Sequence, residues 1–596
     1  MKVLKWLDNN LEQAILLILL CGMTIVMGGQ IIARYAFSAS LSWSEEITRY
    51  MFIISGFISA SYCIKHGLSV KIDQLVGMLP GKGVHYMRLV SYLIQLLFFA
   101  YLVPFAWKYV KAGMASGQLS PACGVPMYLI QSFTVISFVL CCIRLIQKFI
   151  QRVEIITGKR AAEEKLRMSP LVVFILFFVF LLIAIPISVS LGLVAVLPGV
   201  FDPSFTASAS YVIRSMFGGI DSFPLLAVPM FILSGIIMAR GGISKRLFDL
   251  FSFFIGKRTA GLPCAAVITC LFYGAISGSG IATVAAVGSM TIPLLVELGY
   301  DKKFCTALVA VAGSLGVIIP PSIPFIMYGM ASGASVSDIF LAGIVPGVLI
   351  GLLLMVYAVF YCKKHGEDKE KINAKIDALH EQGLWKVFKS SFFAVLSPVI
   401  ILGCIYSGVA SPTEAAVISV FYSLIVSIFI YKSLPIKKVY DVFVEAVRTY
   451  APILFILAAS IAFSRVLTLM QVPQLISGWI LAHFTSKVVV LIVINLVLLL
   501  VGMVMDTTPA ILILTPILLP IVEGFGMNPI HFGVMMVVNL AIGFVTPPIG
   551  VNLFVASSLT DIPVVDIAKR AMPLIGFFLI ALLLITFIPQ ISLCLL

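Results

Sequence analysis

Two apolar regions of this chain are interrupted by glycine and proline in the same way, at positions 227 residues apart. The first cassette comprises Ser277-Gly278-Ser279-Gly280 and Gly316-Val317-Ile318-Ile319-Pro320-Pro321-Ser322. The second comprises Asp506-Thr507-Thr508-Pro509 and Gly543-Phe544-Val545-Thr546-Pro547-Pro548-Ile549. Within a bilayer, backbone groups freed from a helix must be satisfied by protein or by a water-filled cavity. Interrupted helices paired in this way indicate the substrate and ion site of a secondary transporter.

The composition indicates a protein that crosses a membrane many times. Of the 596 residues, 61% are hydrophobic and 11% are charged, and apolar runs of about 20 residues recur along the chain. The net charge of +14 does not require a nucleic-acid partner, because most Lys and Arg fall in short loops, where they set membrane topology. The 11 cysteines are scattered through apolar segments without metal-ligand spacing. A basic start before a long apolar run without a clear cleavage site predicts a retained first span.

Hydropathy and loop charge predict an all-α polytopic membrane protein with about 13 through-going spans and two re-entrant hairpins, near 262–298 and 487–522. Basic residues from Arg144 to Arg167 follow the fourth span, which places that loop and the N-terminus in the cytoplasm. The same rule makes the two hairpins enter from opposite faces, as inverted repeats do. The predicted through-going spans are 11–33, 46–64, 85–107, 125–146, 170–197, 223–240, 305–332, 338–362, 392–409, 412–431, 448–466, 531–556 and 572–596.

The first long charged loop also divides the chain into domains. We expect a small four-helix membrane domain over 1–150, a charged cytoplasmic linker over 151–168 and a large transport domain over 169–596. Within the large domain, two predicted spans precede the first hairpin and three precede the second. Their pairing is left open: either the fourth span supplies the missing partner, or 170–197 is more broken than its hydropathy indicates.

Several motifs resemble those of a known family. Arg34-Tyr35, Ser42-Trp43-Ser44-Glu45-Glu46 and Arg49-Tyr50 resemble the small membrane subunit of tripartite ATP-independent periplasmic (TRAP) transporters. Ser411-Pro412-Thr413-Glu414-Ala415-Ala416 and both cassettes resemble the large subunit, so the whole chain resembles a fused permease. The resemblance implies an elevator-type, sodium-coupled importer of the bacterial inner membrane that receives its substrate from a periplasmic binding protein. The fused form resembles sialic-acid permeases, which implies N-acetylneuraminate, with C4-dicarboxylates or other sugar acids as alternatives.

Each cassette is suited to a cation, and two or more sodium ions are expected. Glycines let the backbone turn tightly, and Pro320-Pro321 removes two donors, so upstream carbonyls lose their helical partners. The alternative for both cassettes is a patch of small residues for helix packing. The predicted sodium ligands of the first cassette are Ser277, Gly316, Val317 and Ile319, and those of the second are Thr507, Thr508, Gly543, Val545, Pro547 and Asn552.

Asp506 is the most informative single residue for locating the site. A carboxylate near the membrane centre costs about 2.5–3.5 kcal/mol on insertion scales and should face a partner or a cavity. It is suited to balancing sodium charge or to accepting hydrogen bonds from a polyol; the alternative is a carboxylate that caps a half-helix. Neither cassette contains Lys or Arg, so an acid would meet hydroxyls, helix N-termini and bound cations. The predicted substrate-binding residues are Ser277, Ser279, Ser322 and Asp506.

Other functions fit the sequence less well. An intramembrane enzyme needs a nucleophile and base, or metal ligands, at membrane depth, but the six histidines lie in loops or at span ends. A channel does not need two hairpins that enter from opposite faces. An ATP-driven pump needs a nucleotide-binding loop, and none is present. We therefore expect a transporter without an organic cofactor and without a catalytic centre.

Overall fold

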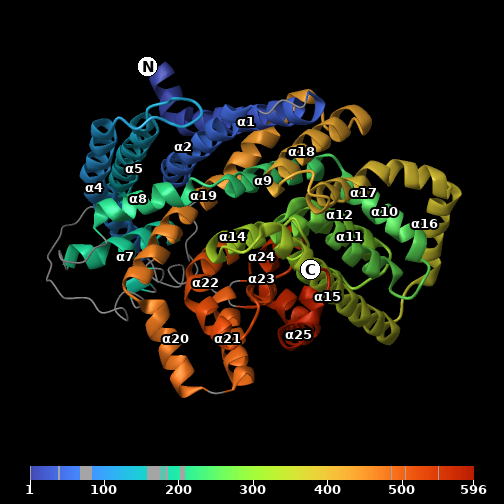
Figure 1. Cartoon of the computed structure of the whole chain (residues 1–596). Helices are drawn as coiled ribbons and strands as arrows, with labels where there is room; N and C mark the ends of the chain where they lie inside the picture. The colour runs from blue at the N-terminus through green and yellow to red at the C-terminus, as the bar shows by residue number, and fades with distance from the viewer. Residues whose placement is uncertain are drawn as a thin grey trace. The chain divides into compact units, whose positions relative to one another are not determined.

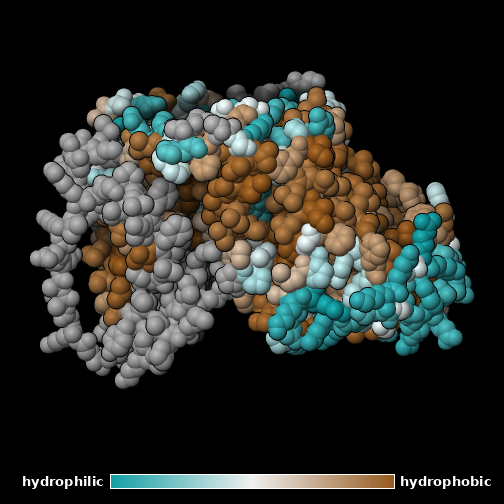
Figure 2. Space-filling view, turned by 90° about the horizontal axis from the view of Figure 1, so that it is seen from below, coloured by the Kyte–Doolittle hydropathy of each residue, from teal (hydrophilic) through white to brown (hydrophobic). Residues whose placement is uncertain are grey.

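The computed structural model describes residues 2–37, 41–66, 83–156, 176–177, 179–180, 185–201, 208–484, 486–503, 505–547 and 550–596. These residues form helices, turns and one isolated β-bridge, between Leu119 and Pro126 (Figure 1). Among them, 12 helices are long and apolar enough to cross a membrane. Hydrophobic side chains also cover a broad area of the surface, with hydrophilic ones gathered at its margin (Figure 2). The predicted all-α polytopic membrane fold is therefore confirmed.

The chain forms two compact units, of which the first comprises residues 1–226 and 443–476. Within it α1 packs against α2, and α5 packs against both α2 and α4. Its helices are α1 (Lys2–Ala36), α2 (Ser42–His66), α4 (Gly83–Ser116), α5 (Met127–Ile156), α7 (Ile187–Phe201), α8 (Ala209–Ile220), η1 (Phe223–Leu226), most of α19 (Val439–Leu469) and the start of α20 (Val472–His483).

The second unit comprises residues 227–442 and 477–596 and contains both cassettes. Its helices are α9 (Ala227–Arg240), α10 (Ile243–Ile255), α11 (Gly261–Ser277), α12 (Gly280–Glu297), α13 (Lys302–Gly313), η2 (Ser314–Val317), α14 (Ile323–Ser332), α15 (Val336–His365), α16 (Lys369–Glu381), α17 (Leu384–Tyr406), α18 (Pro412–Ile425), η3 (Val426–Ile430), η4 (Ile436–Lys438), α21 (Lys487–Gly502), α22 (Thr507–Gly524), α23 (Pro529–Gly543), α24 (Val551–Thr560), α25 (Val564–Phe587) and α26 (Gln590–Leu593).

Each predicted hairpin is a pair of helices separated by a short break at the expected tip. α11 packs against α12, and α21 packs against α22. Of the 12 long apolar helices, α12 and α22 are second arms of hairpins, and the others correspond to predicted through-going spans. The predicted spans 305–332 and 531–556 are each divided into two α-helices, because the Pro-Pro pair of each cassette removes backbone donors and disfavours a continuous helix.

The helices that carry the cassettes repeat with an offset of 227 residues. α12 and α22 both contain 18 residues, and their first residues, Gly280 and Thr507, differ by this offset. The next three helices correspond in the same way: α23, α24 and α25 are the equivalents of α13, α14 and α15 at nearly the same offset. The residue that caps the N-terminus is Ser279 in α12 and Asp506 in α22, and each side chain accepts a hydrogen bond from a backbone N–H of its helix. The two cassettes therefore occupy equivalent positions in two copies of a structural repeat.

The same offset also pairs the helices that precede each hairpin. α7 corresponds to α18, and α8 together with α9 corresponds to the single helix α19. The difference arises because α8 ends at Ile220 and the chain resumes a helix only at Phe223, whereas α19 is continuous. Within the predicted span 170–197, a named helix begins at Ile187, and most of the residues equivalent to α17 lie outside the described residues.

The basic residues after the fourth predicted span do not begin a loop. α5 continues to Ile156, and Arg144 is buried within it, with Nε 2.6 Å from Oε1 of Glu12 on α1. Ser61 donates to the same oxygen at 3.1 Å, and Nζ of Lys65 lies 3.4 Å from Oε2. Placing Arg144 in a charged loop was therefore wrong, since the buried carboxylate of another helix is its partner. Residues 157–168 of the predicted linker lie outside the described residues.

Two residues of the small-subunit signature join separate parts of the first unit. Oε2 of Glu46 accepts hydrogen bonds from the backbone N–H groups of Ala122 (2.8 Å) and Cys123 (2.9 Å). A guanidinium nitrogen of Arg49 lies 3.5 Å from Oδ1 of Asp221, the residue that ends α8. Both interactions connect residues far apart in sequence, so this signature supports the fold of the unit.

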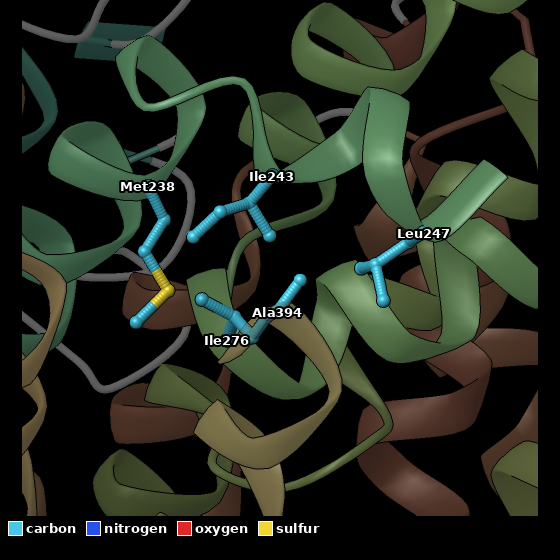
Figure 3. Close-up of a cluster of buried hydrophobic side chains, with 5 residues drawn as sticks. All are labelled: Met238, Ile243, Leu247, Ile276 and Ala394. Carbon is cyan, nitrogen blue, oxygen red and sulfur yellow. The ribbon is translucent and has the colours of Figure 1, made fainter. Parts of the chain in front are cut away.

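A hydrophobic cluster in the second unit anchors the tip of the first hairpin (Figure 3). Ile276 precedes the break and packs with side chains from α9, α10 and α17. Within a membrane such a cluster stabilises the helices through close van der Waals packing. The first arm therefore ends at a fixed position. The cluster comprises Met238, Ile243, Leu247, Ile276 and Ala394.

Candidate functional site

The break of the first hairpin occupies two residues. Gly278 has φ +60°, a conformation that favours glycine, and its N–H bonds the carbonyl of Gly274 at 2.9 Å. Ser279 is extended and caps α12, because its Oγ accepts a bond from the N–H of Ala282 at 3.4 Å. A Cβ added to Gly278 would lie 2.8 Å from the carbonyl oxygen of Pro321. The hairpin tip therefore touches the unwound stretch of the same cassette.

The unwound stretch runs from Ile318 to Ser322, between η2 and α14. Ser322 begins α14: its Oγ accepts a bond from the N–H of Phe325 at 3.4 Å and donates to the carbonyl of Val317 at 2.5 Å. A Cβ on Gly316 would lie 2.6 Å from the carbonyl oxygen of Ser279. The structure thus brings the two segments of the first cassette together backbone to backbone.

Hydroxyl oxygens gather at this contact. Oγ of Ser277 lies 3.1 Å from Oγ1 of Thr283 and 3.3 Å from the carbonyl oxygen of Ser279. Thr283 in turn donates to that carbonyl at 2.8 Å. Ser277, Thr283 and Ser322 are buried. A group of hydroxyl and carbonyl oxygens without a cationic side chain can surround a hard cation or bind an anion through its donors.

The second cassette has the same construction with a carboxylate in place of a serine. Oδ1 of Asp506 accepts the N–H of Thr507 at 2.6 Å, and the Thr507 hydroxyl lies 3.3 Å from the same oxygen. Asp506 is half-buried, whereas Thr507 and Thr508 are buried. The carboxylate therefore caps α22, and a role at the ion or the substrate remains a prediction.

The other segment of the second cassette follows α23. Gly543 ends that helix, Val545 is fully buried and Pro547 is exposed. The N–H of Asn552, in the first turn of α24, bonds the carbonyl of Phe544 at 3.0 Å. The predicted ligands of this segment thus occupy one short stretch of chain between two helices.

The side chain of Asn552 reaches the first repeat. Its Nδ2 donates to the carbonyl of Ala310 and to the hydroxyl of Ser314, both at 3.2 Å. Oδ1 of this fully buried amide has no hydrogen-bond partner among the described residues. The ring of Phe544 similarly lies 3.3 Å from where a Cβ on Gly280 would be. The two cassettes are therefore neighbours within one unit.

A family model described as the DctM component of tripartite ATP-independent periplasmic transporters matches residues 174–591. This chain belongs to the TRAP transporter family. A second family model, the DctQ component of the same transporters, matches residues 23–155. This TRAP permease is therefore a fused, multi-pass membrane transporter and not an enzyme.

Relatives of this TRAP permease carry several substrate names. It is 38% identical to the isethionate TRAP transporter permease protein DctMQ of Oleidesulfovibrio alaskensis, over 99% of this chain and 95% of that one. It is 30% identical to the sialic acid TRAP transporter permease protein SiaT of Haemophilus influenzae, over 99% and 98%. It is 41% identical to the C4-dicarboxylate TRAP transporter large permease protein DctM of Pseudomonas aeruginosa, over 63% and 86%.

Sequence reasoning missed Thr283 and left the role of Glu414 undecided. Thr283 follows Ser279 by one helical turn, so a hydroxyl spacing of four residues beyond the break could have identified it. Glu414 forms a capping box with Ser411: its Oε2 accepts the N–H of Ser411 at 2.8 Å, and Oγ of Ser411 accepts the N–H of Glu414 at 3.3 Å. The Ser-x-x-Glu spacing predicts such a box directly.

Proposed function

We propose that this TRAP permease imports an organic acid anion together with two or more sodium ions. The observation that carries the proposal is the pair of equivalent cassettes in one compact unit, each with main-chain carbonyls and hydroxyls and without Lys or Arg. Hard cations prefer oxygen ligands, and bound sodium supplies the positive charge that the anion otherwise lacks. Each sodium ion that enters across about 100 mV contributes roughly 2.3 kcal/mol, so two ions suffice for strong accumulation.

N-acetylneuraminate is the specific substrate that the motifs of the fused permease imply, and it remains our first candidate. Isethionate is the second, because a relative aligned over almost the whole of both chains carries that name at 38% identity. Both are anions to which the Ser279 hydroxyl could donate, and the hydroxyls of Ser277 and Ser322 could donate to them after giving up the bonds that they donate to main-chain carbonyls. A C4-dicarboxylate is the third candidate, on the name of a relative of the large component.

Delivery by a periplasmic binding protein and an elevator mechanism complete the proposal. The location of both cassettes in one compact unit supports the second part, since a body that carries the whole site can move it across the membrane without dismantling it. We also propose a cytoplasmic N-terminus and hairpins that enter from opposite faces, in accord with the basic loops. Reporter fusions at residue 1 and at the loop near Lys363 should both report the cytoplasm.

The decisive experiment is uptake into proteoliposomes that contain the full chain. Labelled N-acetylneuraminate, isethionate and a C4-dicarboxylate are offered with a binding protein purified for each, and an inward sodium gradient is compared with an equal potassium gradient. We expect one acid to accumulate only with sodium and its binding protein. Undiminished uptake in potassium would remove sodium coupling, and full-rate uptake without the binding protein would remove the tripartite mechanism.

A further inference from the structure

Two buried asparagines join the first arm of the second hairpin to the helix that ends at the second cassette. Asn539 on α23 donates from Nδ2 to the main-chain oxygen (2.9 Å) and to Oδ1 (2.8 Å) of Asn495 on α21. Asn495 donates from its own Nδ2 to the main-chain oxygen of Leu491 at 2.8 Å and to the hydroxyl of Thr586 at 3.3 Å. Both asparagines are buried. The amides therefore form a clamp, the Asn495–Asn539 pair, between α21 and α23.

The Asn495–Asn539 pair lies just before the cassette along both helices. Asn539 precedes Gly543, the last residue of α23, by about one helical turn, and Asn495 precedes Gly502, the last residue of α21, by about two. The backbones of Gly502 and Gly543 touch, since a Cβ on Gly543 would lie 2.7 Å from Cα of Gly502. One polar contact and one steric contact thus hold both helices in register where the chain opens into the cassette.

The first repeat has no equivalent clamp. The residues offset by 227 from Asn495 and Asn539 are Ile268 and Ala312, which have apolar side chains. There the backbones of Gly274 and Gly316 touch in the same way. Packing a hairpin arm against its neighbour therefore does not require an amide pair, and the pair serves something particular to the second cassette.

The hydrogen bonds of Asn539 are unequal. Its amide group donates twice, whereas its Oδ1 is buried without a hydrogen-bond partner in the described part of the chain. A buried acceptor left unpaired is unfavourable, so an apolar residue would be the simpler choice for packing alone. Asparagine at position 539 is instead useful because its two donated hydrogen bonds fix the position of α21.

We infer that the Asn495–Asn539 pair positions the second cassette for its cation, an inference that rests on the proposed sodium coupling. A shell of main-chain and hydroxyl oxygens keeps its geometry only if the helices that end at it do not shift. Groups that orient the ligands of a metal without touching it commonly change its affinity by about 10–100-fold. Neither asparagine is required to contact sodium, so both act as positioning residues.

The test compares Asn539→Leu with the double variant Asn495→Leu/Asn539→Leu in proteoliposomes. The single variant leaves the oxygens of Asn495 without their donor and should lower the unfolding temperature. The double variant replaces both partners with apolar side chains and should recover most of that loss. In both we expect the sodium concentration for half-maximal uptake to rise about tenfold. The substrate concentration for half-maximal uptake at saturating sodium should stay unchanged, and thermal protection by NaCl relative to KCl should need correspondingly more salt.

Gln95→Leu is the control, because among the described residues the buried amide of Gln95 donates to Ser91 alone, on its own helix α4 in the first unit. It should keep the wild-type sodium curve. A wild-type sodium curve in the double variant would show that the pair serves packing alone and would overturn the inference. The double variant tests the inference even if Asn539→Leu does not fold. If the unaltered protein shows neither sodium-dependent uptake nor thermal protection by sodium, the proposed function fails instead.

Discussion

The backbones of Gly502 and Gly543 lie against each other, so that a Cβ added to Gly543 would overlap the carbonyl group of Gly502. The equivalent relationship in the first repeat joins Gly274 and Gly316, where a Cβ on Gly274 would lie 2.8 Å from Cα of Gly316. Each hairpin therefore meets the helix that leads to its unwound stretch through a pair of glycines. Close backbone approach through small residues is a common way for helices to associate in membranes.

This contact predicts that Gly543→Ala lowers the unfolding temperature and abolishes uptake, because the added methyl group must push α21 away from α23. Gly576→Ala is the matched control: Gly576 lies within α25 with nothing within 4 Å of a Cβ. There alanine should be neutral, or stabilising by up to about 1 kcal/mol through its helix propensity. Thermal unfolding in detergent and proteoliposome uptake measure both effects. Wild-type behaviour of Gly543→Ala would show that the glycine contact is dispensable.

Asp506 both caps α22 and places a carboxylate at the second cassette, and the first repeat offers a way to separate these roles. Ser279 caps α12 at the equivalent position without a charge. Asp506→Ser should therefore keep the cap and the fold yet abolish uptake, if the charge serves the ion or the substrate. Asp506→Ala should lose about 1 kcal/mol of stability in addition. Normal transport by Asp506→Ser would reduce Asp506 to a helix cap.

Ser322→Ala tests the assignment of hydroxyls to the substrate. The variant loses the cap of α14 and the bond to the carbonyl of Val317, so we expect a stability loss of about 1 kcal/mol. We also expect the substrate concentration for half-maximal uptake to rise several-fold, with the sodium curve unchanged. Ser289→Ala, on an exposed position of α12, should change neither curve. A change confined to the sodium curve would make Ser322 part of the ion site instead.

Arg144→Met should strongly destabilise the first unit, because it removes the closest cation from the buried carboxylate of Glu12 and leaves it, among the described residues, with Ser61 and Lys65. Breaking a buried ion pair from one side costs about 3–5 kcal/mol. Glu12→Gln/Arg144→Met removes both charges and should recover most of the loss. Unfolding temperature and monodispersity in detergent report the effect. Equal stability of Arg144→Met and the unaltered protein would show that the pair adds nothing to the fold.

The fold class, the positions of the breaks and the helix caps follow from the sequence, because each is a local property. An apolar run of about 20 residues satisfies its own backbone as a helix wherever it sits. Glycine and proline interrupt a helix through their own geometry, so the first break falls at Gly278 and Ser279, within the predicted tip, and α22 begins directly after Asp506, the first residue of the second predicted tip. The offset of 227 residues likewise identifies equivalent positions before any contact is known.

Which helices face each other was decided only by the tertiary structure. The charge pattern places Arg144 in a loop, whereas in the structure it pairs with the distant Glu12. Asn552, which the sequence groups with Thr507, donates a hydrogen bond to Ser314 of the other repeat. No pattern in the sequence predicts that Asn495 and Asn539 form a pair. These partners are separated by dozens to hundreds of residues, and chain entropy favours none of them in particular. Their pairing arises when buried polar groups find hydrogen-bond partners in the packed interior, a choice that depends on all neighbouring helices at once.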